Sequence, residues 1–232
     1  MERNIEEVVN WTLPGLTLYY RDSDLPPECV SNYRPGSIIM SRAFIDVTSR
    51  AGKPTKNTRF VIASSKAAPV YEVMPDGEKY RLHALLCNSF FKVLDVYKKE
   101  GITQVLLLHI PSSGIEFFRR TVFILGQENL EDKFKTMARQ SLDTKLAGPV
   151  VQALEDQEWV DRTSFPIGQS DDYNLYPLEP VRIPLPLIQL MIANIRRMTN
   201  DEGPMNDPFF GLDATTQQEE TPVVPQPEPR AE

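Results

Sequence analysis

Residues 115–125 read Ile-Glu-Phe-Phe-Arg-Arg-Thr-Val-Phe-Ile-Leu, and the choice of fold depends on the structure that this stretch adopts. Its apolar residues recur at helical spacing, namely Ile115, Phe118, Val122 and Leu125. The aromatic and β-branched residues between positions 117 and 124 favour a strand equally well. A strand here completes the order β-β-β-α-β-β, whereas a helix gives a β-α-β-α unit typical of a ligand-binding α/β domain.

The two segments before this stretch carry clearer patterns. Residues 102–110 (ITQVLLLHI) form a nearly continuous apolar run bounded by Gly and Pro, which predicts a buried central strand. Between Lys79 and Lys99, apolar residues recur at helical spacing opposite polar ones, and Gly101 is well placed to end a helix. We therefore expect one long helix over 79–99.

The first part of the chain is predicted to be rich in strands. The candidates are residues 16–20, 37–48, 59–64 and 70–74. In the second candidate the side chains alternate, so that Phe44 is expected on the same face as Arg42 and away from the apolar row. The fold class is therefore α+β, with a β-rich N-terminal half.

The later part of the chain is predicted to be helical and interrupted by proline. Patterns indicate a helix over 128–145, an extended Pro-rich stretch over 163–186 and an amphipathic helix over 187–198. Beyond residue 203 the composition is that of a disordered segment. The predicted parts are a core domain over 1–145, a helical extension packing on it over 146–202, and a disordered acidic Pro-rich tail over 203–232.

The net charge of the chain is concentrated at its end. The formal net charge is −7, and the residues from Asp201 to Glu232 include eight acidic residues against one Arg. The rest of the chain is balanced, but residues 42–66 are locally basic, with Asp46 as their single acid. A neutral body with one basic edge and an acidic tail is typical of a binding protein.

The composition indicates the cellular location to expect. No apolar run approaches the roughly 20 residues that span a membrane, and the first residues carry no apolar core of a secretory signal. Cys29 and Cys87 do not indicate a disulfide framework. We expect reduced thiols and a cytoplasmic location.

The basic segment favours nucleic acid as a ligand. A basic strand and loop can follow a phosphodiester backbone while aromatic rings stack on bases. The candidate contact residues are Arg42, Phe44, Arg50, Lys53, Lys56, Arg59, Lys66 and Tyr71. The first expectation is therefore a non-catalytic accessory protein that prefers single strands, with the tail modulating binding. The alternative is a solvated hairpin, with Phe44 covered by an element such as the C-terminal helix.

The expected order of elements supports this ligand by resemblance. The order β-β-β-α-β-β resembles the OB-fold, a small barrel that binds single strands. An OB-like body followed by an acidic tail also resembles the layout of single-stranded-DNA-binding proteins. The resemblance covers organisation, because no stretch matches a family motif and the predicted helix over 79–99 is long for that fold.

A second hypothesis assigns the tail to a protein partner. Phe209, Phe210 and Leu212 lie in the acidic segment Asn206–Asp213, and apolar rings there suit a short motif that enters a partner's pocket. Such an assembly protein would also use the amphipathic helix over 187–198. The rings could instead fold back onto the body of the same chain.

A third hypothesis is a small-ligand-binding α/β protein or an enzyme. A strand, the small-residue turn from His109 to Gly114 and a following helix would direct backbone N–H groups at an anion, although no phosphate-loop sequence is present. His83 and Cys87 lie four residues apart on the predicted helix, which fits a structural pair better than a catalytic one. We expect no catalysis, no cofactor and no metal site, and the sequence does not predict an oligomeric state.

Overall fold

The computed structural model describes residues 2–121, 124–125, 128–182 and 185–201. Its centre is a seven-stranded sheet in the order β2-β6-β7-β4-β1-β3-β5. The strands are β1 Thr17–Ser23, β2 Ile38–Ser41, β3 Ile45–Thr48, β4 Thr58–Ser64, β5 Leu82–Leu85, β6 Ser89–Lys99 and β7 Ile102–Ile110. The pair β4 and β7 is parallel and the other neighbours are antiparallel, so the predicted α+β class is confirmed.

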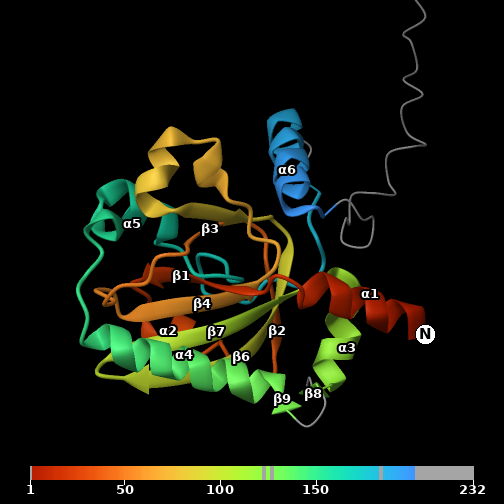
Figure 1. The fold of residues 1–232 in the computed structure, drawn as a ribbon, viewed down its shortest axis with the longest axis horizontal. Coiled ribbons are helices and arrows are strands. Elements are labelled where there is room, and N and C mark those ends of the chain that lie inside the picture. Colours follow the sequence, from red (N-terminus) through yellow and green to blue (C-terminus); the bar gives the residue numbers. More distant parts are fainter. Residues whose placement is uncertain (1, 122–123, 126–127, 183–184, 202–232) are drawn as a thin grey trace, which may run out of the picture.

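Helices surround this sheet (Figure 1). They are α1 Glu2–Thr12, α2 Pro27–Val30, α3 Ile115–Arg120, α4 Leu130–Leu146, α5 Gln157–Thr163 and α6 Pro186–Thr199. Short 3₁₀ turns lie at Val70–Glu72, Pro75–Tyr80, Ser112–Gly114 and Gln152–Glu155, and a two-stranded ribbon joins β8 Ile124–Leu125 to β9 Glu128–Asn129. No helix in the described part of the chain is long and apolar enough to cross a membrane.

The sheet is covered on both faces, and strand β7 shows why. Val105 and Leu107 pack in one core with Cys29 of α2 and Ile167, whereas Leu106 and Leu108 belong to the opposite core. That second core also takes apolar side chains from α1, α3 and α4. Because successive side chains of a strand point to opposite faces, a strand buried on both sides is apolar throughout. The prediction of a buried central strand over 102–110 is confirmed.

The predicted helix over 79–99 is wrong. That stretch forms the end of a 3₁₀ turn, strand β5 and strand β6, and β6 continues through Glu100 and Gly101 into β7 as a hairpin. Both turn residues have positive φ, 50° and 82°, which is the backbone conformation of a tight hairpin turn. Apolar residues needed on both faces of the sheet had produced an accidental helical spacing.

The decisive stretch over 115–125 contains both predicted structures in succession. Helix α3 ends at Arg120, Thr121 is extended, and β8 follows at Ile124. The predicted strand over 37–48 is divided into β2 and β3 by a bend around Ala43, and the strand over 70–74 is a 3₁₀ turn instead. The sheet therefore has seven strands ending at β2 and β5, and the OB-like arrangement is not found.

The C-terminal region is partly as expected. Helices α4 and α6 confirm the two predicted helices, and residues 163–169 pack against the sheet through Ile167. The division into domains stays a prediction. The predicted disordered tail lies outside the described residues.

Candidate functional site

The predicted nucleic-acid contacts do not share one environment. Arg50 donates to the carbonyl of Lys79, Lys53 is exposed, and Lys56 is paired with Asp24 at 3.5 Å. Arg59 is only 2% exposed and binds both carboxylate oxygens of Asp22 through Nε and Nη2, at 2.7 and 2.6 Å. A buried and neutralised guanidinium cannot follow a phosphate backbone.

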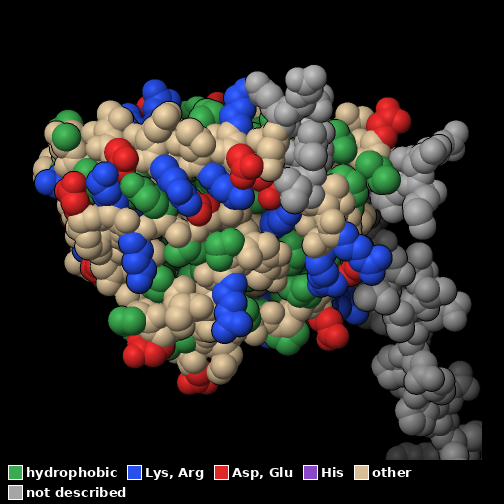
Figure 2. Space-filling view, turned by 90° about the horizontal axis from the view of Figure 1, so that it is seen from below, with side chains coloured by type: hydrophobic (Ala, Val, Ile, Leu, Met, Phe, Trp, Pro, Cys, Tyr) green, Lys and Arg blue, Asp and Glu red, His purple; other side chains and the backbone are tan. Residues whose placement is uncertain are grey.

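The predicted stacking rings are also committed within the protein. Phe44 packs with Ile195 of α6, as the covered alternative anticipated. The Arg42 guanidinium lies 4.7 Å from the ring centre of Tyr176, and the Arg81 guanidinium lies 5.0 Å from that of Tyr71. On the face shown in Figure 2, Lys and Arg side chains lie among acidic and apolar ones and form no continuous patch.

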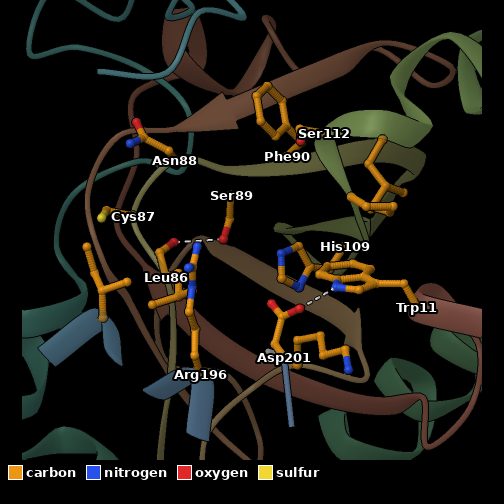
Figure 3. Close-up of a pocket in the computed structure, with 14 residues that line it drawn as sticks. Trp11, Leu86, Cys87, Asn88, Ser89, Phe90, His109, Ser112, Arg196 and Asp201 are labelled. Atoms are coloured by element: carbon orange, nitrogen blue, oxygen red, sulfur yellow. Dashed lines mark hydrogen bonds between the residues drawn. The ribbon is translucent and has the colours of Figure 1, made fainter. Parts of the chain in front are cut away.

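The turn after β7 lines a small pocket (Figure 3). His109 and Ser112 meet Trp11 of α1, the β5–β6 connection, and Arg196 and Asp201 at the end of α6. Trp11 Nε1 donates to Asp201 Oδ1 at 2.9 Å.

Two features argue against the predicted anion site at this turn. Helix α3 has six residues, so it offers little dipole to an anion. A Cβ placed at Gly114 would lie 2.9 Å from Val8 Cγ1, so the glycine permits the close packing of α1. The turn is thus explained by packing.

His109 is a neutral core residue at the base of this pocket. Burial lowers the pKa of His109 to about 3, with a smaller contribution from the charge of Lys66. Ser64 Oγ accepts from the Lys66 amide and lies 2.9 Å from His109 Nδ1.

The predicted His83–Cys87 helical pair does not exist. His83 lies on β5 and Cys87 lies in the connection to β6. The Nδ1 atom of His83 is 2.9 Å from the carbonyl oxygen of Arg81, and the His83 ring contacts the rings of Tyr19 and Tyr71. Because a carbonyl only accepts, Nδ1 carries the proton. Burial lowers the pKa of His83.

Among the described residues, Arg21 has two buried side-chain nitrogens without a hydrogen-bond partner, and the sequence analysis missed this residue. Its residue is 1% exposed, and its neighbours on the inward face of β1 are Tyr19 and Ser23. Nη2 donates to the carbonyl of Phe165 at 2.5 Å, and the guanidinium carbon lies 4.0 Å from the ring centre of Phe165. Nε and Nη1 are buried and have no hydrogen-bond partner among the described residues.

The carboxylate that influences Arg21 is already engaged. Asp46 raises the pKa of Arg21, but its Oδ2 pairs with Arg162 at 3.1 Å. Burial is the larger effect and lowers the pKa of Arg21 to about 10, so the guanidinium is still charged at neutral pH. The result is a buried cation with two unused donors.

Residues 163–168 lie over this cation. Besides the Phe165 contacts, Ser23 Oγ donates to the carbonyl of Thr163 at 2.5 Å, and Tyr33 donates to that of Ile167 at 2.8 Å. Gly168 has a φ of 79° and approaches Ile39 closely, so it belongs to the same packed cover. We call residues 163–168 the cover segment.

Other predicted features are placed or remain open. The described residues contain no cluster of His, Cys, Asp and Glu suited to a metal ion, and Cys29 and Cys87 are buried without a disulfide there. Phe209, Phe210 and Leu212 lie outside the described residues.

Comparisons by sequence give no match. No protein-family model matches the chain, and no curated protein does.

Comparisons by structure give partial likenesses of low similarity. The type III effector XopAI from Xanthomonas axonopodis pv. citri is 13% identical over 44% of this chain and 43% of its own, with a TM-score of 0.37. Exoenzyme S from Pseudomonas aeruginosa, solved with human 14-3-3 protein beta and carba-NAD, is 12% identical over 46% and 54%, with a TM-score of 0.36. HopU1 of Pseudomonas syringae pv. Tomato, an ADP-ribosyltransferase, is 17% identical over 41% and 46%, with a TM-score of 0.35.

These likenesses cover about half the length of the matched chains and do not assign their reactions to this protein. The prediction of a single-strand-binding, OB-like accessory protein is wrong. The structural reasons are the seven-stranded sheet, the buried Arg59–Asp22 pair and the packed ring of Phe44.

Proposed function

We propose that this protein binds a small ligand carrying a phosphate or carboxylate group, and that Arg21 holds that group. The observation that carries the proposal is the pair of buried Arg21 nitrogens without an acceptor. Buried polar groups in native proteins are almost always hydrogen-bonded, so an orphaned pair needs an explanation. An anion supplies two acceptors and the opposite charge at once.

Energetics favour a functional explanation over a structural one. A buried cation without a full set of partners lowers the stability of the fold. Arg59 shows how the same sheet satisfies a buried guanidinium, because Asp22 binds two of its nitrogens and the carbonyl of Gly52 binds the third. Arg21 has one carbonyl instead. Energetically costly arrangements of this kind are commonly retained at ligand sites.

The site is closed as described. Phe165 supplies both the carbonyl and the ring that contact Arg21, and Thr163 and Ile167 fix the cover segment on either side. A ligand reaches Nε and Nη1 after the cover segment moves. Binding and displacement of this segment are therefore coupled in the proposal.

The surroundings suit a ligand with a ring as well as an anionic group. Tyr19, Tyr71 and His83 form an aromatic cluster, and Tyr19 shares the inward face of β1 with Arg21. His83 Nε2 is left as an acceptor, since Nδ1 is engaged with the Arg81 carbonyl. NAD⁺ combines phosphates with two aromatic bases and is the first organic ligand to test.

The test is calorimetric titration of the full chain with inorganic pyrophosphate, NAD⁺ and phosphate-free nicotinamide. We expect pyrophosphate and NAD⁺ to bind and nicotinamide alone to bind at least tenfold more weakly. Arg21→Met should weaken pyrophosphate binding at least tenfold. Arg50→Met removes a charge from an exposed Arg and is the matched control, which should bind as the parent does.

Two results would contradict the proposal. The proposal is wrong if the parent protein binds neither anion at millimolar concentration, or if Arg21→Met binds both as tightly as the parent. Release of nicotinamide from NAD⁺, followed in the same samples, would show whether binding leads to cleavage of the bond between nicotinamide and ADP-ribose, with water as the acceptor of the ADP-ribose group when no other acceptor is present.

A further inference from the structure

Helix α6 is amphipathic, and the described residues cover only the C-terminal part of its apolar face. There, Ile195 and Met198 pack against Ala68, Ala84 and the ring of Phe44. Toward the N-terminus of α6, Leu187 and Met191 continue the same face at four-residue spacing, yet Leu187, Leu190 and Met191 are 69%, 58% and 43% exposed. The apolar face of such a helix normally packs against another element.

The exposed residues lie close together in sequence. Positions 187, 190 and 191 follow the i, i+3, i+4 spacing of a single helix face, and Leu185, the N-cap residue just before the helix, is 56% exposed. We call Leu185, Leu187, Leu190 and Met191 the α6 stripe. Figure 1 shows α6 standing apart from the helices that cover the sheet.

We propose that the α6 stripe is the docking surface for residues 206–213 of the same chain, with Phe209 and Phe210 as the apolar anchors. This segment follows α6 directly in the sequence and contains the only paired aromatic residues beyond residue 200. The proposal decides between the two roles that the sequence leaves open for the paired rings, in favour of the body of the same chain.

The lengths of chain allow this contact. Helix α6 ends at Thr199, and Leu187 lies 12 residues earlier, which is about 18 Å along the helix axis. Phe209 lies eight residues after Asp201, a distance that an extended chain covers up to about 26 Å. The paired rings can therefore return along α6 as far as Leu187.

The anchored position of Asp201 makes docking of the residues that follow it more favourable. Asp201 accepts the Trp11 indole N–H at 2.9 Å, and the Asp201 amide donates to the carbonyl of Arg196 at 3.0 Å. The following residues thus begin from one position beside α6. Docking a tethered segment needs no loss of translational freedom, so its effective concentration is high.

The charges are complementary. Residues 185–200 contain Arg196 and Arg197 and no acidic residue, whereas residues 201–213 contain four acidic residues and no basic one. The C-terminal end of α6 and the segment therefore attract each other electrostatically.

The direct test is photo-crosslinking in the full chain. A photoreactive benzoylphenylalanine replaces Phe210, and an equal mixture of ¹⁴N- and ¹⁵N-labelled protein distinguishes links within one chain from links between copies. We expect linked peptides that join position 210 to residues 185–191 with a single isotope label. Links of mixed label would identify a second copy as the occupant and overturn the proposal, as would links confined to other elements.

A second experiment does not depend on the photoreactive residue. A fluorescent peptide of residues 202–216 is titrated with the full chain that carries Phe209→Ala and Phe210→Ala, and anisotropy is measured. The peptide with Phe209→Ala and Phe210→Ala should bind at least tenfold more weakly, and so should the parent peptide with the same full chain that also carries Leu190→Ser. Equal affinity of the parent and double-alanine peptides would overturn the proposal.

The matched control lies further along the same tail. In the full chain, Val223→Ala and Val224→Ala remove apolar groups from the same acidic tail, outside residues 206–213, and should leave binding of the apolar dye ANS unchanged. Phe209→Ala and Phe210→Ala should raise ANS fluorescence at least twofold by uncovering the α6 stripe. An equal response of both double variants would overturn the proposal.

Discussion

Arg21 and Phe165 lie 144 residues apart in sequence, and Phe165 contacts the Arg21 guanidinium twice. Its carbonyl oxygen accepts from Nη2 at 2.5 Å, and its ring centre lies 4.0 Å from the guanidinium carbon. One residue of the cover segment thus takes the place of the acidic partner that a buried arginine usually has. The remaining donors of Arg21 are what the proposed ligand satisfies.

Two buried arginines should respond oppositely to the same substitution. Arg21→Met removes a charge with unused donors and should change the free energy of unfolding by less than about 1 kcal/mol or increase it. Arg59→Met leaves Asp22 without its partner and should cost about 3 kcal/mol. Urea denaturation of both variants measures the difference. A loss for Arg21→Met as large as that for Arg59→Met would show that Arg21 is mainly structural.

The ion pair between Lys92 and Glu131 joins α4 to the sheet and offers a second stability test. Nζ and Oε1 are 2.7 Å apart, and both side chains are 7% exposed. Lys92→Met should cost about 3 kcal/mol, because it leaves a buried carboxylate unpaired. The double variant Lys92→Met with Glu131→Leu should recover most of that loss. A double-mutant cycle in which the two losses simply add would contradict this account.

His109 should make stability depend on pH. Its pKa is lowered to about 3 in the folded protein by burial, whereas an unfolded histidine titrates near its ordinary value of 6.5. Below pH 6.5 the unfolded chain therefore binds a proton that the folded protein does not, and stability falls as the pH falls toward 3. The slope from this residue approaches about 1.4 kcal/mol per pH unit.

The measurement is chemical denaturation at several pH values between 7.5 and 4. His109→Gln should have a slope between pH 6 and 4 that is shallower by about one bound proton. His83, whose pKa is also lowered, contributes in the same direction and serves for comparison. An unchanged slope in His109→Gln would show that His109 is not neutral in the folded state.

Gly52 should resist any substitution. A Cβ at this position would lie 2.7 Å from Val151 Cγ2 and 2.9 Å from both Pro149 O and Val151 N, and two of these atoms are backbone. Gly52→Ala should therefore destabilise the protein by about 1–3 kcal/mol, as overpacking does. Gly148→Ala, whose nearest contact would be 3.3 Å, should cost less. Thermal denaturation compares the two variants, and equal losses would contradict the argument.

The sequence predicted the elements whose pattern has one meaning. The unbroken apolar run of β7 and the amphipathic spacing of α6 both gave correct structures. The prediction of a helix over residues 79–99 was wrong because β5 and β6 lie in a sheet with cores on both faces. Their apolar residues therefore follow no two-residue alternation. Spacing alone cannot separate such strands from a helix.

The candidate site was harder to predict because it depends on distant parts of the chain. The alternation of β1 could have revealed Arg21, since it shares the inward face with Tyr19 and Ser23. Nothing local indicates that Phe165 would cover it or that Asp46 would pair with Arg162. The prediction of a nucleic-acid site on the basic segment was wrong for the same reason, a contact with a distant part of the chain. Asp22, on another strand, neutralises Arg59.

Hydrogen exchange of residues 163–168, the cover segment, during titration with pyrophosphate tests the central claim most directly. If the anion binds Arg21 after the cover segment moves, saturation should raise the exchange rates of these amides in the parent protein and leave them unchanged in Arg21→Met. Exchange that stays the same in the parent at saturating pyrophosphate, or that rises equally in Arg21→Met, would contradict the account.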